Sequence, residues 1–178
     1  MKERLLKGVF AQDIITYIFH HGERIPTPKT LEVSFAFVEQ EARTLLVVME
    51  RKFLANNIAN RLSEALFISS GYIIETSIPP EVLKGFHEKN PENTKIIFFD
   101  DVDIPNVSKL SLYGSGLMNT ALYNDYSGHG SIWYIVVTSR KHGSIVGITR
   151  NSVVTIFNKM DKAEFLDYVI EEVFPLIL

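Results

Sequence analysis

Two adjacent carboxylates at the end of an apolar segment are the residues whose types and spacing best suit chemistry. Residues 96–99 are all apolar, and Asp100 and Asp101 follow them directly. Two carboxylates at the end of a buried strand can orient Mg²⁺ and activate a water molecule beside a phosphate. A strand that simply ends in solvent-exposed acids has the same pattern. Whether the pair indicates a phosphate site therefore depends on the order of the surrounding elements.

A second candidate lies where residues 45–49, an apolar strand, lead through Glu50, Arg51 and Lys52 into a helix over residues 54–66. Strand, short polar loop and helix are the layout of a phosphate loop, in which backbone N–H groups at the helix N-terminus face the phosphates.

The residues that such a loop needs are missing. The motif G-x-x-x-x-G-K-[ST] would cover residues 49–56, with Met49 and Leu54 at the glycine positions, Ala55 at the lysine and Asn56 at the hydroxyl. Side chains at the glycine positions oppose the tight turn around a triphosphate. We therefore expect at most weak phosphate contacts, from Arg51, Lys52 and Asn56.

The elements that would position these residues follow from the hydrophobic periodicity. Residues 5–18 have apolar side chains at helical spacing, which predicts an N-terminal amphipathic helix followed by a loop to residue 30. Residues 31–37 alternate between apolar and polar, which predicts a strand with one buried face. Residues 45–49 do not alternate, as is typical of a strand covered on both faces.

The remainder of the chain predicts alternating strands and helices. We expect strands over residues 72–78, 95–99, 131–137 and 152–157, and helices over residues 79–86, over residues 108–123, and after the capping pair Asp161 and Glu164. This alternation predicts an α/β fold, a three-layer α/β/α arrangement with a mostly parallel central sheet and an antiparallel edge hairpin near the N-terminus. We expect a single domain, 1–178, with a helix and loop over 1–30 and an α/β core over 31–178.

In this order of elements the chain resembles the additional-strand phosphate-loop ATPases, which have a RecA-like fold. Its C-terminal half is most similar to the DNA-translocating and DNA-packaging ATPases of the HerA/FtsK type. The residues that carry the resemblance are 96–101, then Gly128 and His129 before the strand that ends at Thr138, then 148–151 before the last strand.

The resemblance implies a role for four residues. Asp100 would orient Mg²⁺, Asp101 would activate water, Thr138 would sense the γ-phosphate, and Arg150 would lie near the nucleotide of a neighbouring subunit. Because the phosphate loop departs from the family pattern, we expect no cofactor. The ligand that the resemblance implies is Mg-ATP. The predicted function is that of a non-hydrolysing ATPase-like interaction or scaffold subunit in a DNA-handling assembly, such as one of a mobile genetic element. The alternative within this class is an active ATPase with an atypical phosphate loop.

A rival hypothesis from another class starts at the same loop. Glu50 and Lys52 after a strand fit the E-x-K element of PD-(D/E)xK nucleases, in which an acid and a lysine hold Mg²⁺ and water near a phosphate. Glu32, Glu39 or Glu41 would supply the upstream acid. This hypothesis leaves the Asp100 and Asp101 pair unexplained.

Composition limits the partners. A net charge of −3 and a pI of about 6.0 give no overall case for nucleic-acid binding, so DNA would be reached through an assembly of protein partners or self-associated copies. The absence of cysteine excludes disulfide and thiolate chemistry. No apolar run reaches the roughly 18 residues that span a bilayer. We expect a cytoplasmic protein that has no contact with membranes.

Overall fold

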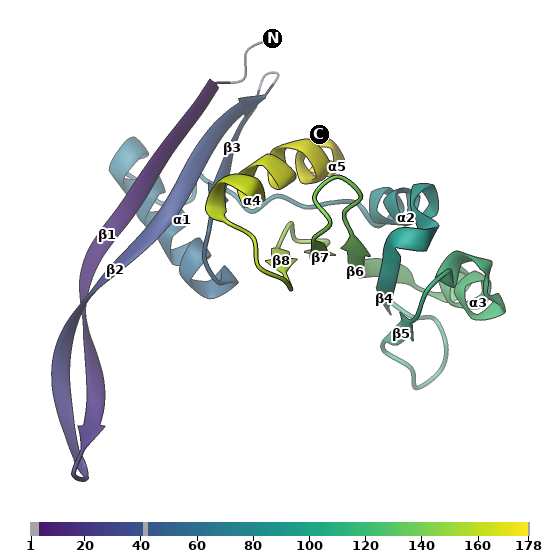
Figure 1. Cartoon of the computed structure of the whole chain (residues 1–178), viewed down its shortest axis with the longest axis horizontal. Helices are drawn as coiled ribbons and strands as arrows, with labels where there is room; N and C mark the ends of the chain where they lie inside the picture. The colour runs from purple at the N-terminus through teal and green to yellow at the C-terminus, as the bar shows by residue number, and fades with distance from the viewer. Residues whose placement is uncertain (1–3, 41–42, 178) are drawn as a thin grey trace. The chain divides into compact units, whose positions relative to one another are not determined.

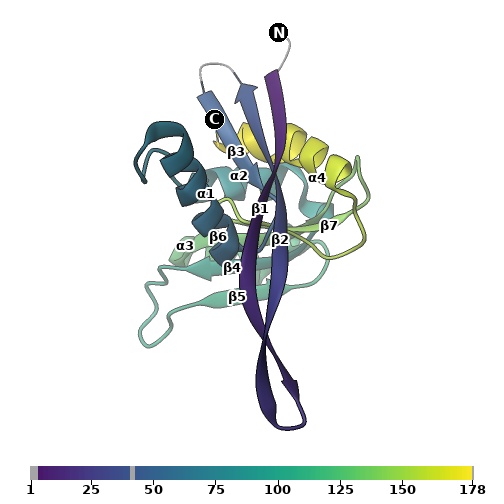
Figure 2. The same ribbon diagram turned by 90° about the vertical axis from the view of Figure 1, so that its left-hand side faces the viewer.

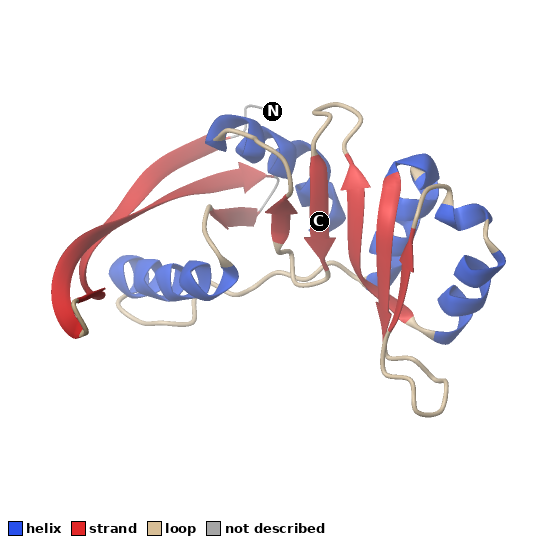
Figure 3. Cartoon of the chain, turned by 60° about the horizontal axis from the view of Figure 1, so that its bottom comes forward, coloured by secondary structure: helices blue, strands red, loops and turns tan. Residues whose placement is uncertain are grey.

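The computed structural model describes residues 4–40 and 43–177 and contains two antiparallel sheets. One has three strands in the order β1-β2-β3, and the other has five in the order β5-β4-β6-β7-β8 (Figures 1 and 3). The chain divides into two compact units, Met1–Ile74 and Glu75–Leu178, and each sheet belongs to one of them. Among the described residues, no helix has the length and apolarity needed to cross a membrane.

The predicted three-layer α/β/α fold with a parallel sheet is wrong, because every strand pairing in the described part of the chain is antiparallel. The physical reason lies in the connections. Parallel neighbours need a crossover of a dozen or more residues, whereas β6 is joined to β7, and β7 to β8, by short turns. The strand at Ile145–Thr149 was not predicted from the sequence, and it occupies the segment where a crossover helix would have to be.

The first unit consists of a long hairpin, a third strand and one helix: β1 (Arg4–His20), β2 (Glu23–Gln40), β3 (Arg43–Val48) and α1 (Lys52–Phe67). The strands predicted over 31–37 and 45–49 and the helix predicted over 54–66 are confirmed. Ala36 and Val38 of β2 lie opposite Val47 and Leu45 of β3, and these four side chains are buried. The core of this unit therefore lies on one face of the three-stranded part.

The predicted N-terminal helix is wrong, because residues 4–20 form β1. Its apolar residues recur every four positions at Leu6, Phe10, Ile14 and Ile18, and a spacing of four places side chains on one face of a strand as well as of a helix. The two residues that follow this segment distinguish a strand from a helix. His21 and Gly22 both have positive φ, 49° and 83°, as a two-residue type I′ hairpin turn requires.

The second unit contains the five-stranded sheet and most of the helices. Its elements are α2 (Pro80–Lys89), β4 (Thr94–Asp100), β5 (Leu110–Tyr113), α3 (Ala121–His129), β6 (Ser131–Thr138), β7 (Ile145–Thr149), β8 (Val154–Ile156), α4 (Lys162–Tyr168) and α5 (Phe174–Ile177), with short 3₁₀ turns at Pro91–Asn93 and Leu117–Asn119.

Several predictions for this unit are confirmed, namely the strands over 95–99, 131–137 and 152–157 and the helix that begins near Pro80. The strand expected over 72–78 is absent from the described structure, and the helix expected over 108–123 is replaced by β5, a 3₁₀ turn and the start of α3. Gly114 and Gly116 have positive φ, 152° and 66°, which explains why no helix passes through them.

The C-terminal helix begins at the predicted cap. The Asp161 side chain accepts hydrogen bonds from the backbone N–H groups of Ala163 and Glu164, and the Glu164 side chain accepts one from Asp161, which completes a capping box. Between α4 and α5 the helix widens into a π turn, Val169–Val173, in which Phe174 N–H donates to Val169 O. Pro175 accounts for this turn, because it has no N–H to donate and its ring clashes with a regular preceding turn.

Candidate functional site

The structure brings together three of the four residues to which the resemblance gives catalytic roles. Arg150, in the turn between β7 and β8, donates from Nη2 to Asp100 Oδ2 at 2.9 Å and from Nη1 to Asp100 Oδ1 at 3.2 Å. Asp101 accepts a longer bond from Nη1 at 3.5 Å. Asp100 ends β4, and Asp101 follows it with a positive φ of 52°. The sequence indicated Asp100 and Asp101 as one site but assigned Arg150 to the nucleotide of a neighbouring subunit, whereas here it contacts both acids of its own chain.

The arrangement is that of an ion pair rather than an open metal site. Both oxygens of Asp100 face the guanidinium, whose positive charge occupies the position where a cation would bind. Nearby, His129 Nδ1 lies 2.7 Å from Asp103 Oδ1. In the described part of the chain, no group of three or more histidine and acidic side chains is arranged to hold a metal ion. The role of Asp100 as a Mg²⁺ ligand stays a prediction.

Thr138 lies away from this cluster. β4 and β6 are antiparallel, so Asp100 pairs with Ser131 at the start of β6, whereas Thr138 ends β6 beyond the Thr94 to Val137 pair. In a parallel sheet the two strand ends would meet at one edge. The antiparallel pairing therefore separates the predicted γ-phosphate sensor from the acids by the length of a strand.

The residues predicted to contact phosphate belong to the first unit. Only three residues separate the end of β3 at Val48 from the start of α1 at Lys52, so Lys52 and Asn56 are already helical. Glu50 Oε1 accepts a hydrogen bond from Arg51 N–H at 2.9 Å, which places a carboxylate at the helix N-terminus where a phosphate would bind. β3 and β4 also lie in different sheets, so this loop and the acid pair are not the two halves of one sheet-edge site.

Of the described upstream acids in the nuclease hypothesis, only Glu32 lies near the turn that carries Glu50 and Lys52. Glu32 is two residues before Ser34, whose carbonyl oxygen accepts a hydrogen bond from Met49 N–H at 2.9 Å. Glu39 pairs with Thr44 at the opposite end of β3 and lies 3.8 Å from Arg4. Glu41 lies outside the described residues.

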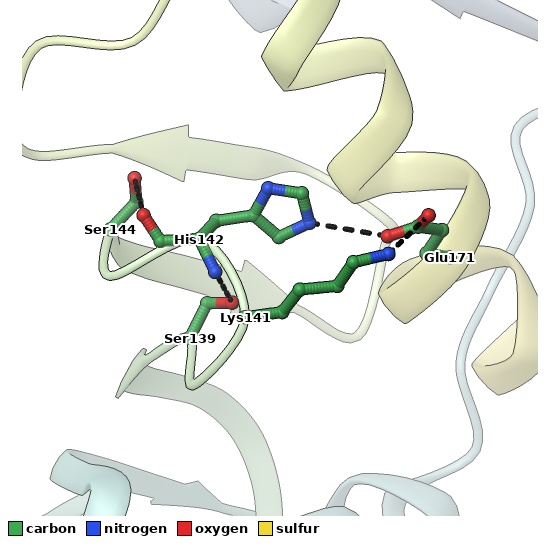
Figure 4. A network of polar contacts seen from close by, with 5 residues as sticks. All are labelled: Ser139, Lys141, His142, Ser144 and Glu171. Atoms are coloured by element: carbon green, nitrogen blue, oxygen red, sulfur yellow. Dashed lines mark hydrogen bonds and ion pairs between the residues drawn. The ribbon is translucent and has the colours of Figure 1, made fainter.

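A polar network that the sequence did not indicate connects the β6–β7 turn to the C-terminal helix (Figure 4). Lys141 Nζ donates to Glu171 Oε1 at 2.6 Å, and His142 Nε2 lies 3.3 Å from Glu171 Oε2. The hydrogen bond from Lys141, with a smaller contribution from His142, lowers the pKa of Glu171. Ser139 Oγ accepts from the backbone N–H of His142 rather than from its ring, so the network holds the turn in place and contains no activated serine nucleophile.

Exposed apolar side chains that the sequence did not indicate lie on the β1–β2 hairpin. β3 pairs with β2 only over residues 35–40, so residues 9–20 and 23–34 form a two-stranded ribbon, which we call the hairpin arm (Figures 1 and 2). The arm carries large apolar side chains with exposed fractions of 37% to 79%: Val9, Ile15, Tyr17, Ile18, Phe19 and Ile25. The signal in the sequence was His21-Gly22 between segments rich in β-branched and aromatic residues.

The hairpin turn fixes which backbone groups of the arm face outward. A two-residue turn makes its flanking residues, His20 and Glu23, a hydrogen-bonded pair. The backbone N–H and C=O groups of even-numbered residues of β1 therefore bond to β2, and those of odd-numbered residues face the outer edge. On β2 the even-numbered residues face away from β1. The bond from Met49 N–H to Ser34 O agrees with this parity.

The two outer edges of the arm differ. Pro26 and Pro28 are even-numbered residues of β2, so the edge that faces away from β1 lacks two N–H donors. The outer edge of β1 has no proline from Arg4 to His20, and its register with β2 runs without a bulge from Arg4 to His20. Proline and bulges are the usual means of blocking an exposed strand edge. The arm therefore has one blocked edge and one open edge.

Comparison of the chain with protein-family models, with curated proteins and with solved structures finds no match.

Proposed function

We propose that this chain is an interaction subunit that binds another polypeptide through its hairpin arm. The observation that carries the proposal is the exposure of large apolar side chains on a two-stranded ribbon. A two-stranded hairpin is at best marginally stable in water, and large exposed apolar side chains gathered on one element are typical of a protein interface. The proposal keeps the interaction part of the function predicted from sequence and drops the fold on which that prediction was built.

The arm suits a polypeptide better than a nucleic acid. Its charged residues are Asp13, Glu23, Glu32, Arg24 and Lys29, three acids against two bases. A nucleic-acid surface needs a basic stripe that neutralises phosphates, and this mixture has no such excess. The DNA-handling assembly predicted from the resemblance stays a prediction.

A polypeptide also suits the arm better than a lipid surface. The outward N–H and C=O groups of β1 need hydrogen-bond partners, which the hydrocarbon region of a bilayer does not supply. Another strand supplies them together with apolar side chains, and this mode of binding is strand addition to a sheet edge. The arm therefore offers both kinds of contact that a β-strand partner would use.

Site-specific photocrosslinking of the full chain in its own cells tests the proposal. A photoreactive side chain replaces Ile15, which is 60% exposed on the arm, or Asn60, an exposed residue of α1 that serves as the matched control. We expect discrete protein adducts from position 15 and none of those adducts from position 60. Equal adduct patterns at the two positions, or co-sedimentation with lipid vesicles that Phe19→Ser abolishes, would overturn the proposal.

A further inference from the structure

We infer that the partner of the hairpin arm is a second copy of this chain, with the two β1 strands paired antiparallel across their outer edges and Phe10 opposite Phe10. The inference rests on the proposed function of the arm and names its partner. It would join two three-stranded sheets into one continuous antiparallel sheet in the order β3-β2-β1-β1-β2-β3.

The backbone of β1 is suited to this pairing. From Leu5 to Phe19 every odd-numbered residue keeps an outward N–H and C=O, and no residue of β1 is a proline. Antiparallel pairing of two such edges must join odd-numbered residues to odd-numbered residues, because only these face outward. This condition leaves only registers in which the two-fold axis passes through a residue of β1.

Charge selects one of these registers. Lys7 and Asp13 lie on the same face of β1, and among the described residues Lys7 forms no ion pair. An axis through Phe10 places Lys7 opposite Asp13 of the second copy, and the symmetry repeats the pair. Moving the axis to Val9 or Ala11 places Asp13 opposite an apolar residue instead. An axis through Asp13 places two carboxylates in contact, which is destabilising.

The same register pairs apolar side chains along the central part of β1. Leu5 lies opposite Ile15, Leu6 opposite Ile14, and Phe10 opposite itself. Leu5, Leu6 and Ile15 are 44%, 64% and 60% exposed in the single chain. Cross-strand pairs of aromatic, branched and oppositely charged residues are the contacts that stabilise a sheet. The pairing therefore joins opposite charges at Lys7 and Asp13, and apolar side chains at Leu5 and Ile15 and at Leu6 and Ile14.

A single introduced cysteine reads the register directly, because the chain has none of its own. Residues opposite each other in a non-hydrogen-bonded antiparallel pair have Cα atoms about 4.5 Å apart, within the range that a disulfide bridges. We expect Phe10→Cys to form a covalent dimer under mild oxidation. Gln12→Cys, on the same face, is the matched control, because its two copies would be four residues apart, about 13 Å. Covalent dimer from Gln12→Cys and none from Phe10→Cys would overturn the register.

Exchange of the two charges tests the partner independently of cysteine. Lys7→Asp places carboxylates opposite each other, and Asp13→Lys places lysines opposite each other, so we expect each variant alone to dimerise at least tenfold more weakly in sedimentation equilibrium. The double variant, and an equimolar mixture of the two single variants, restore both opposite-charge pairs and should recover dimerisation. Weakening in the single variants without recovery in either restored case would overturn the Lys7 to Asp13 pairing.

The two proposals fail in distinguishable ways. A chain that is monomeric at all concentrations, but whose photoreactive residue 15 captures a different protein, overturns self-pairing and keeps the interaction function of the arm. A chain that dimerises equally well with Val9→Pro, which removes an outward N–H near the centre of the pairing, overturns pairing through the β1 edge. Circular dichroism of Val9→Pro and of Val9→Ala verifies that both variants keep their strands.

Discussion

Both oxygens of Asp100 accept hydrogen bonds from the guanidinium of Arg150, and this two-fold contact ties the end of β4 to the turn between β7 and β8. The Asp100 side chain is 19% exposed and that of Arg150 is 30% exposed, so water screens the pair only in part. Asp101 is 73% exposed and contributes a longer bond. The residues that suggested phosphate chemistry thus form an ion pair that links the end of β4 to the β7–β8 turn.

Asp100→Asn is therefore expected to lower the free energy of unfolding by about 1–2 kcal/mol, because charged hydrogen bonds are lost from a partly buried pair. Asp101→Asn is the matched control and is expected to change stability by less than about 0.5 kcal/mol. Urea denaturation of the two variants measures the difference. Equal changes in the free energy of unfolding would show that the shorter hydrogen bonds of Asp100 add no stability.

His87 is a second residue with a measurable role. Its side chain is fully buried, its Nδ1 lies 2.8 Å from Thr94 Oγ1, and its Nε2 has no hydrogen-bond partner among the described residues. Burial lowers the pKa of His87 from its usual 6.5, and the neighbouring Glu88 opposes that shift in part. The folded protein therefore keeps this imidazole neutral at a pH where the unfolded chain would already bind a proton.

This difference predicts how stability depends on pH. The contribution is fully present above pH 6.5 and is lost as the pH falls below it, with a slope of at most about 1.4 kcal/mol per pH unit for one proton. Denaturant unfolding at pH 7.5 and pH 5.5 measures the loss in the native chain and in His87→Asn, whose amide can occupy the place of Nδ1. We expect His87→Asn to lose less stability between pH 7.5 and pH 5.5 than the native chain does. An identical loss in the two proteins would show that other groups cause the pH dependence.

At the scale of single elements, the end of α1 shows local strain. Ile68 follows the helix in the left-handed conformation, with φ of 64°, and its side chain is 96% exposed. Glycine normally occupies this position, since a side chain in this conformation costs about 1–2 kcal/mol and a β-branched one is a clear outlier. Nothing in the burial of Ile68 offsets that strain.

Ile68→Gly is expected to raise the free energy of unfolding by about 1 kcal/mol, because the strain disappears and no buried contact is lost. Ile68→Ala keeps a Cβ atom and serves as the control, with an expected gain smaller than that of Ile68→Gly. Thermal unfolding followed by circular dichroism compares the variants. Destabilisation by glycine would show that the Ile68 side chain makes a contact that outweighs its strain.

At the scale of the whole molecule, the two sheets divide the residues that a nucleotide site would need. The helix N-terminus at Lys52 follows β3 of the three-stranded sheet, and the acids follow β4 of the five-stranded sheet. Nucleotide hydrolysis depends on positioning these groups together around one phosphate chain. The architecture therefore does not supply the sheet edge on which the resemblance relied.

Mg-ATP is accordingly expected to leave the melting temperature unchanged at millimolar concentration. A site filled at 100 times its dissociation constant would add about 2.7 kcal/mol of stability, which a thermal scan detects readily. The same scan with Mg²⁺ alone separates an ion effect from a nucleotide effect. An upward shift with Mg-ATP, absent with Mg²⁺, would favour the active ATPase with an atypical phosphate loop.

The sequence by itself determined the elements whose local signals are unambiguous. The helix at Lys52–Phe67, the capping box at Asp161 and the apolar strand at Ser131–Thr138 follow from periodicity and cap chemistry alone. The adjacent acids Asp100 and Asp101 also follow from the sequence, but their contact with Arg150 of the same chain does not.

Only the tertiary structure decided strand direction, and with it the separation of Thr138 from the acids. Apolar strands have the same composition whether their neighbours run parallel or antiparallel, because direction is set by the connections and by pairing between distant segments. The same ambiguity changed residues 4–20 from a predicted helix into β1, since an apolar spacing of four fits both. Local chemistry therefore specified most of the elements, and the pairing of β1 with β2 created the surface on which the proposed function depends.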